Sequence, residues 1–150
     1  MEWSIKTYDE LTKDELYEIL KKRIDVFVVE QNCPYDEIDN RDKDSYHIFF
    51  KKDKDIIAYL RVLEPGISFE DVSIGRVLVD KNQRGNGLAI EMMDKAIDFI
   101  INNLRYDIIR ISAQEYLISF YENLGFKKVS NVYLEDDIPH VEMVYQNYKK

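Results

Sequence analysis

Hydrophobic and polar residues repeat with two different periods along the chain, and each period predicts its own kind of element. Apolar residues three or four positions apart predict helices over 12–28 and 88–101 and a short helix over 117–124. Short runs rich in β-branched and aromatic residues predict strands. They cover 3–8, 46–50, 56–63, 72–79, 107–113, 126–133 and 140–145. The order β-α-β-β-β-α-β-α-β-β indicates an α/β (α+β) fold with a mixed sheet and helices packed on it.

Residues that start and stop elements support this assignment. Thr12 and Glu15 have the spacing of a capping box at the start of the first helix, and Gly125 stands where a helix commonly ends. The strand over 72–79, the helix after it and the return at 107 form a plausible βαβ crossover. Because the sequence contains no repeat and no flexible linker, we expect residues 1–150 to form one domain.

Charge and composition narrow the classes of partner. The 21 basic and 29 acidic residues give a net charge of −8, which disfavours nucleic acid and anionic membranes and favours cations. No apolar stretch is long enough to cross a membrane, and the first residues lack the pattern of a signal peptide. Cys33 is the single cysteine, so no internal disulfide can form. These features predict a cytoplasmic protein.

One glycine-containing loop, residues 84–89, lies between a predicted strand and a predicted helix. Small residues let a ligand approach the backbone, and a helix N-terminus attracts phosphate. The lysine and hydroxyl residue of an ATP-binding P-loop are missing, because Leu88 and Ala89 follow Gly87. Two interpretations stay open at this point: an anion site suited to a pyrophosphate, or a glycine-rich turn before a helix.

Two signatures extend this loop into a family resemblance. Arg84-x-x-Gly87-x-Ala89 resembles the coenzyme A motif of the GCN5-related N-acetyltransferase (GNAT) superfamily. Residues 120–126 resemble its second signature, aromatic-Tyr-x-x-x-Gly-Phe. Three blocks, at 23–35, 74–77 and 135–140, resemble the ElaA-like branch. The resemblance covers the whole chain and implies the GNAT acyl-CoA N-acyltransferase fold, a mixed, mostly antiparallel sheet with helices on both faces.

The resemblance also implies a cofactor and its ligands. Acetyl-CoA would be the co-substrate, with its pantetheine arm along Leu78 and Val79 and its pyrophosphate on the amides of 84–89. Tyr121 would be the general acid for the leaving thiolate; its alternative is a core aromatic residue on a short helix. Gln114 replaces an asparagine common in the superfamily, and Asn40 and Asp137 stand where relatives often have glycine. The expected cofactor-binding residues are Leu78, Val79, Arg84, Gly85, Asn86, Gly87, Leu88, Ala89, Gln114 and Tyr121.

The general base is open among several residues. Glu64 and Asp71 are predicted at the ends of central strands, and His140 has a pKa near neutral pH in its unperturbed form. Each of the three also has a purely structural interpretation. His47 is expected to be structural, and Cys33 a packed small residue rather than a nucleophile. With two distant histidines and one cysteine, no metal site is expected.

The resemblance implies an N-acetyltransferase that acts on a primary amine, in a small molecule or a protein, and the net charge favours a cationic acceptor. The alternatives are a non-catalytic acyl-CoA-binding module and an ATP-binding protein. An exposed edge on the last strand would permit a homodimer. Five carboxylates before the second strand form either a mouth that attracts cations or a solvated loop: Glu30, Asp36, Glu37, Asp39 and Asp42.

Overall fold

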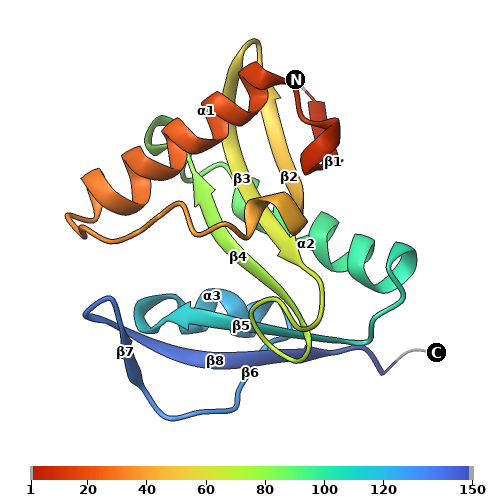
Figure 1. Cartoon of the computed structure of the whole chain (residues 1–150). Helices are drawn as coiled ribbons and strands as arrows, with labels where there is room; N and C mark the ends of the chain where they lie inside the picture. The colour runs from red at the N-terminus through yellow and green to blue at the C-terminus, as the bar shows by residue number, and fades with distance from the viewer. Residues whose placement is uncertain (1, 149–150) are drawn as a thin grey trace.

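The computed structural model describes residues 2–148, which form a mixed sheet with helices on both faces (Figure 1). The strands lie in the order β1-β2-β3-β4-β5-β8-β6, and β7 also pairs with β8. Among the strands of residues 2–148, β4 and β5 are the one parallel pair. The helices are α1 (Lys13–Arg23), α2 (Leu88–Asp98) and α3 (Ile118–Asn123). The strands are β1 (Glu2–Thr7), β2 (Ser45–Lys52), β3 (Asp55–Leu63), β4 (Val72–Val79), β5 (Ile108–Gln114), β6 (Lys127–Lys128), β7 (Tyr133–Glu135) and β8 (Ile138–Gln146).

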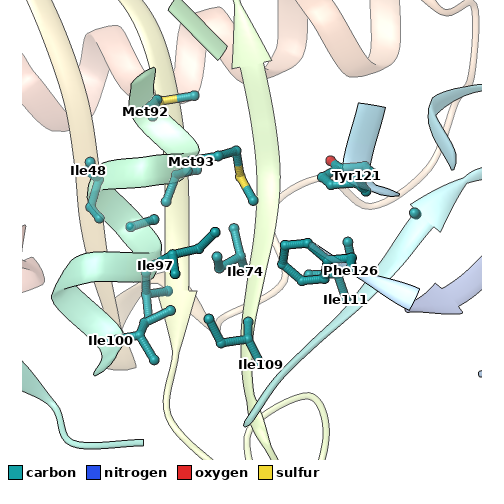
Figure 2. Close-up of a cluster of buried hydrophobic side chains, with 14 of the residues drawn as sticks. Ile48, Ile74, Met92, Met93, Ile97, Ile100, Ile109, Ile111, Tyr121 and Phe126 are labelled. Carbon is teal, nitrogen blue, oxygen red and sulfur yellow. The ribbon is translucent and has the colours of Figure 1, made fainter. Parts of the chain in front are cut away.

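The sheet separates two hydrophobic clusters. On one face α1 and the π-helical segment Ile24–Glu30 that continues it pack Ile19 and Val26 against the sheet. On the other face α2 directs Met93 and Ile97 toward the strands, and the π-helical segment Phe99–Asn103 that continues it adds Ile100, as Figure 2 shows. Tyr121 of α3 and Phe126 after it complete this side. Burying such side chains contributes about 1.5–3 kcal/mol each, so packing on both faces holds the sheet in place.

The two parallel strands separate soon after they meet. β4 and β5 pair only through Val72 with Ile109 and Ser73 with Arg110, and Figure 1 shows them diverging beyond that point. On the other edge of β4, two residue steps of β3 correspond to three steps of β4, which is a β-bulge. Arg76 lies in this bulge with a left-handed φ of +54°. The β4 backbone beyond Gly75 is therefore paired with β3 and open toward β5.

Most predicted elements are confirmed. The strand over 72–79 matches β4 residue for residue. The capping box is present: the Thr12 hydroxyl accepts from the Glu15 amide at 3.0 Å, and Glu15 accepts from the Thr12 amide at 2.9 Å. The βαβ crossover is β4-α2-β5. No helix within 2–148 is long and apolar enough to span a bilayer.

Two expectations about the C-terminal region are wrong. The segment 126–133 is not one strand, because only Lys127–Lys128 and Tyr133–Glu135 pair with β8, and Val129 and Val132 between them are half exposed. The last strand has no exposed edge of the kind expected for a homodimer. β8 is paired with β5 on one side and with β6 and β7 on the other.

Candidate functional site

A cavity of about 400 Å³ lies where β4 and β5 diverge. Residues 73–77 of β4 form one wall, and Ile111, Ser112 and Gln114 of β5 form the other. The β7–β8 hairpin and the segment before β2 complete the lining. The volume is in the range of small-molecule sites. The divergence of two neighbouring strands therefore opens a ligand-sized space at the centre of the sheet.

Tyr121 reaches this cavity from α3. The side chain is 7 % exposed, with edge-to-face contacts to the rings of Phe120 and Phe126. In Figure 2 its hydroxyl points toward β4. Burial raises the pKa of Tyr121 above its ordinary value, and no group among residues 2–148 hydrogen-bonds the hydroxyl. Tyr121 thus presents a neutral hydroxyl whose proton is available to a ligand.

His140 enters the cavity from β8 and is 6 % exposed. Its Nδ1 lies 2.6 Å from the Ile138 carbonyl oxygen. A carbonyl can only accept a hydrogen bond, so Nδ1 carries a proton. Nε2 lies 3.5 Å from the Glu135 carboxylate, and the ring of Tyr133 stacks on the imidazole. An imidazole in the cavity with a carboxylate beside Nε2 has the groups that proton transfer to or from a ligand needs.

The other two predicted base candidates lie elsewhere. Glu64 is absent from the cavity lining and accepts a hydrogen bond of 2.7 Å from the Tyr106 hydroxyl. Asp71 forms an ion pair with Arg110 at 3.2 Å. The structure therefore brings Tyr121, Gln114 and His140 to one cavity and leaves Glu64 outside it.

Gln114 ends β5 at the rim of the cavity, and its side-chain amide donates to Gln31 across the opening at 3.4 Å. Cys33 is buried beside it, with Sγ 3.5 Å from the Asp136 carbonyl oxygen, in agreement with a packed small residue. These contacts join the segment before β2 to the β7–β8 hairpin. The join closes one side of the cavity.

The glycine-containing loop follows β4 directly and begins α2. Gly85 and Gly87 have left-handed φ values of +85° and +76°, and no atom lies within 4 Å of where a Cβ would be. Gly87 is the N-cap of α2 and supplies no side-chain cap, and the Glu91 amide is the first to bond back, to the Gly87 carbonyl, so the amides of Leu88 and Ala89 have no partner within the helix. Such a helix start attracts phosphate oxygens.

Arg84 has a role that the sequence did not suggest. Its Nε donates to the Val79 carbonyl oxygen at 3.0 Å, and its two terminal nitrogens bind the Glu30 carboxylate at 2.7 and 3.0 Å. The guanidinium therefore ties the loop to β4 and to the end of the π-helical segment. The Arg84 charge is thus already paired, and the backbone amides are the groups of the loop that could bind an anion.

Both sequence-based interpretations of the acidic segment are wrong for its buried members. Three arginines from α1, β3 and β4 neutralise three of these carboxylates inside the protein, at 2.5–3.4 Å. Burial alone would raise the pKa of Asp39, but the Arg61 guanidinium holds it well below its usual range. The ion pairs are Arg23 with Glu37 and Asp42, Arg61 with Asp39 and Asp42, and Arg76 with Glu37 and Asp39.

The sequence contained one signal of this network that was missed. Arg61 interrupts the otherwise apolar run 56–63. A charge inside a buried strand needs a partner. His47 is structural as expected: it is fully buried, with Nδ1 2.6 Å from the Tyr59 hydroxyl and Nε2 2.9 Å from the Asp42 carbonyl oxygen. Within the described part of the chain, no three His, Cys, Asp or Glu side chains are arranged to hold a metal ion.

Comparisons with known proteins agree with this geometry. A family model described as "Acetyltransferase (GNAT) domain" matches residues 9–147. "Protein ElaA" of Escherichia coli K12 is 39 % identical over 145 residues, 95 % of each chain, and the Escherichia coli ElaA crystal structure superimposes with a TM-score of 0.89 over 97 % of this chain and all of that one. An acyl-CoA N-acyltransferase from Pseudomonas aeruginosa superimposes with a TM-score of 0.90, at 39 % identity, over 97 % and 99 % of the two chains. An aminoglycoside 6'-N-acetyltransferase complexed with coenzyme A, 11 % identical, shares the fold with a TM-score of 0.73 over 98 % of both chains.

Proposed function

Because the chain belongs to the GNAT acetyltransferase family, we propose that it transfers the acetyl group of acetyl-CoA to a primary amine in the cavity between β4 and β5. The family relationship favours an enzyme over a non-catalytic acyl-CoA-binding module. One observation carries the proposal. The open edge of β4 leads from the cavity, which holds the Tyr121 hydroxyl, to the uncapped start of α2.

This path matches the parts of acetyl-CoA in order. The pyrophosphate would bind the amides of residues 84–89, where a helix N-terminus offers unpaired donors. The pantetheine arm would lie beside Leu78 and Val79 as an added strand, because the β4 backbone is open toward β5. The thioester would then reach the cavity near the bulge at Arg76. The aminoglycoside acetyltransferase of the same fold, which was solved with coenzyme A, supports this assignment.

The reaction needs a base, because the acceptor amine is protonated at neutral pH. For an amine with a pKa near 10.4, deprotonation at pH 7 costs roughly 4–5 kcal/mol. His140 Nε2 would take this proton, with Glu135 stabilising the imidazolium. The amine then attacks the thioester carbonyl and forms a tetrahedral intermediate. Holding the amine and the thioester together in the cavity supplies a further part of the rate.

Tyr121 would complete the transfer. As the carbon–sulfur bond breaks, the electron pair goes to sulfur and the Tyr121 hydroxyl donates its proton there. The nitrogen loses its second proton to water and becomes an amide. Tyr121 is then protonated again from solvent, and His140 releases the first proton to solvent. Because burial raises the pKa of Tyr121, the hydroxyl is neutral and able to donate throughout the neutral range.

A pair of glycine variants tests the cofactor site. Gly87 and Gly66 both have left-handed φ values and open space around the Cβ position, so an alanine strains the backbone similarly at each. Acetyl-CoA at about 100 times its dissociation constant should stabilise the wild-type protein by roughly 2.7 kcal/mol. We expect Gly87→Ala to lose much of this stabilisation and amine-dependent thiol release, and Gly66→Ala to keep both. Equal acetyl-CoA binding by the two variants would contradict the assignment.

A further inference from the structure

We propose that the acceptor carries a carboxylate in addition to its amine, so that the substrate class is small amino-acid-like molecules rather than plain cationic amines. This inference rests on the proposed acetyl transfer and deepens it. Its basis is the distribution of charge around the cavity: an arginine without a carboxylate partner lies at one end, and exposed carboxylates lie at the other.

Most charges beside the cavity cancel. The three arginines at positions 23, 61 and 76 are matched by the three carboxylates at positions 37, 39 and 42, so this network has no net charge. The strongly acidic segment therefore does not make the cavity acidic. Any preference of the cavity for a positively or negatively charged ligand therefore has to come from ionised groups outside this network.

Arg41 is the cation that remains. It lines the cavity, and its guanidinium donates to the Ser68 hydroxyl at 2.9 Å. No carboxylate among residues 2–148 lies within ion-pair distance of it. Its backbone is held in place, because its amide donates to Asp39 at 3.1 Å and its carbonyl accepts from the Ser45 hydroxyl at 2.7 Å. Arg41 is thus an exposed cation with spare donors at a cavity wall, where it can bind a carboxylate.

A second observation points to an anion at the same wall. Arg61 also lines the cavity, is 2 % exposed, and shares the Asp39 carboxylate with the Arg41 amide. Its Nε is the one buried side-chain nitrogen or oxygen in the described chain without a hydrogen-bond partner. Buried donors are nearly always satisfied in folded proteins. A ligand carboxylate at this wall would bring acceptor oxygens to the neighbourhood of both guanidinium groups.

The opposite end has the complementary charge. Glu135 and Asp136 lie in the exposed β7–β8 hairpin, and Glu135 makes only long contacts, 3.5 Å to His140 Nε2 and 3.3 Å to the Ser112 hydroxyl. His140 pairs with Gln114 at the far end of β5, about 16 Å along the strand from Ile109, where β4 and β5 still pair. Ser68, the partner of Arg41, comes from the connection that leads into that closed end. The acceptor amine would face His140 and its carboxylate would face Arg41.

Matched acceptors test this inference. The probes are 4-aminobutyrate against butylamine, 6-aminohexanoate against hexylamine, and L-lysine against cadaverine, which differ only in the carboxylate. We expect kcat/KM, measured by thiol release from acetyl-CoA and by product mass, to be at least about tenfold higher for the carboxylate member of one or more pairs. Arg41→Gln should reduce that ratio toward one, and Arg41→Lys should restore part of it. Lys43→Gln, an exposed neighbour outside the cavity, should leave the ratio unchanged.

Three results would overturn the inference. The carboxylate-free amines could be equal or better substrates in all three pairs, or Arg41→Gln could leave the ratio intact. The wild-type protein could bind acetyl-CoA and acetylate none of the six probes. In each of these cases the proposed acetyl-CoA site would stand. A wild-type protein that acetyl-CoA does not stabilise would overturn the proposed function, and the inference with it.

Discussion

The two walls of the cavity differ in how their polar groups are held. Beside the β4 wall, Arg76 binds the buried Glu37 carboxylate at 2.8 Å, and the fully buried Arg23 of α1 binds the same carboxylate at 2.6 Å. On the β5–β8 wall, the Glu135 side chain is 51 % exposed and lies 3.5 Å from His140. Short, buried and mutually neutralising pairs fix a shape, whereas longer and half-exposed contacts can change partner and protonation. The buried pairs therefore hold the structure beside one wall, and the groups free to exchange partners lie on the other.

The largest expected effect is a loss of stability on breaking the buried network of three arginines and three carboxylates. Arg23→Met leaves Glu37 and Asp42 buried with one cation fewer, which should lower the free energy of unfolding by about 3–5 kcal/mol. Lys21→Met, an exposed position of the same helix, should change it by no more than about 0.5 kcal/mol. Urea unfolding measures both variants. Equal free energies of unfolding for the two variants would show that these ion pairs do not stabilise the fold.

Changing His140, on the β5–β8 wall, should affect the reaction rate more than the stability. His140→Gln should lower kcat roughly 100-fold, because the amine loses its base, and should change the shape of the pH–rate profile. The competing candidate Glu64 lies outside the cavity, so Glu64→Gln should keep both the rate and the profile. If Glu64→Gln lost the rate and His140→Gln kept it, the general base would be Glu64.

The depressed pKa of Asp39 predicts how the buried network responds to acid. An unfolded Asp39 takes up a proton near pH 3.9, whereas the folded one, held by Arg61, resists until much lower pH. Its stabilisation is therefore present above about pH 4 and is lost as the pH falls further. Asp39→Asn should be less stable at pH 7 by about 1.5–3 kcal/mol and should show a shallower loss below pH 4. An acid-unfolding curve parallel to that of the exposed control Asp36→Asn would contradict this.

The smallest expected effect lies in the hairpin that carries Glu135. Asp136 and Asp137 form its two-residue turn with φ values of +49° and +64°, the signs of a type I′ turn. Glycine adopts such values without steric cost, so Asp137→Gly should raise the free energy of unfolding by about 0.5 kcal/mol. Asp36→Gly, at a position without positive φ, should not raise it. Thermal melts of the two variants can test this difference.

Sequence reasoning succeeded where a feature depends on neighbours in the chain. The cap at Thr12, the strand over 72–79 and the turn at Gly87 follow from local patterns and short-range sterics. Asn40 and Asp137, where the family resemblance predicts glycine, have left-handed conformations, which glycine adopts without steric cost. These positions needed no tertiary information.

The features that were missed depend on contacts between distant segments. Arg23 and Glu37, or Arg61 and Asp39, are separated by one or more elements, and a count of acidic residues cannot show which cations cancel them. Arg84 likewise binds a residue that is distant in the chain, Glu30 at the end of the π-helical segment Ile24–Glu30. Three candidate residues reach the cavity and Glu64 does not, because the divergence of β4 from β5 decides which strand ends face it.

The most direct measurement is the turnover of Tyr121→Phe at saturating acetyl-CoA and amine, beside its acetyl-CoA affinity. Tyr116→Phe, a mostly exposed tyrosine five residues away, is the matched control. If the Tyr121 hydroxyl protonates the leaving sulfur, its loss should lower kcat about 100-fold or more with little change in acetyl-CoA binding, and Tyr116→Phe should behave like the wild-type protein. A Tyr121→Phe variant that keeps wild-type kcat would contradict the assignment of acyl transfer to this hydroxyl.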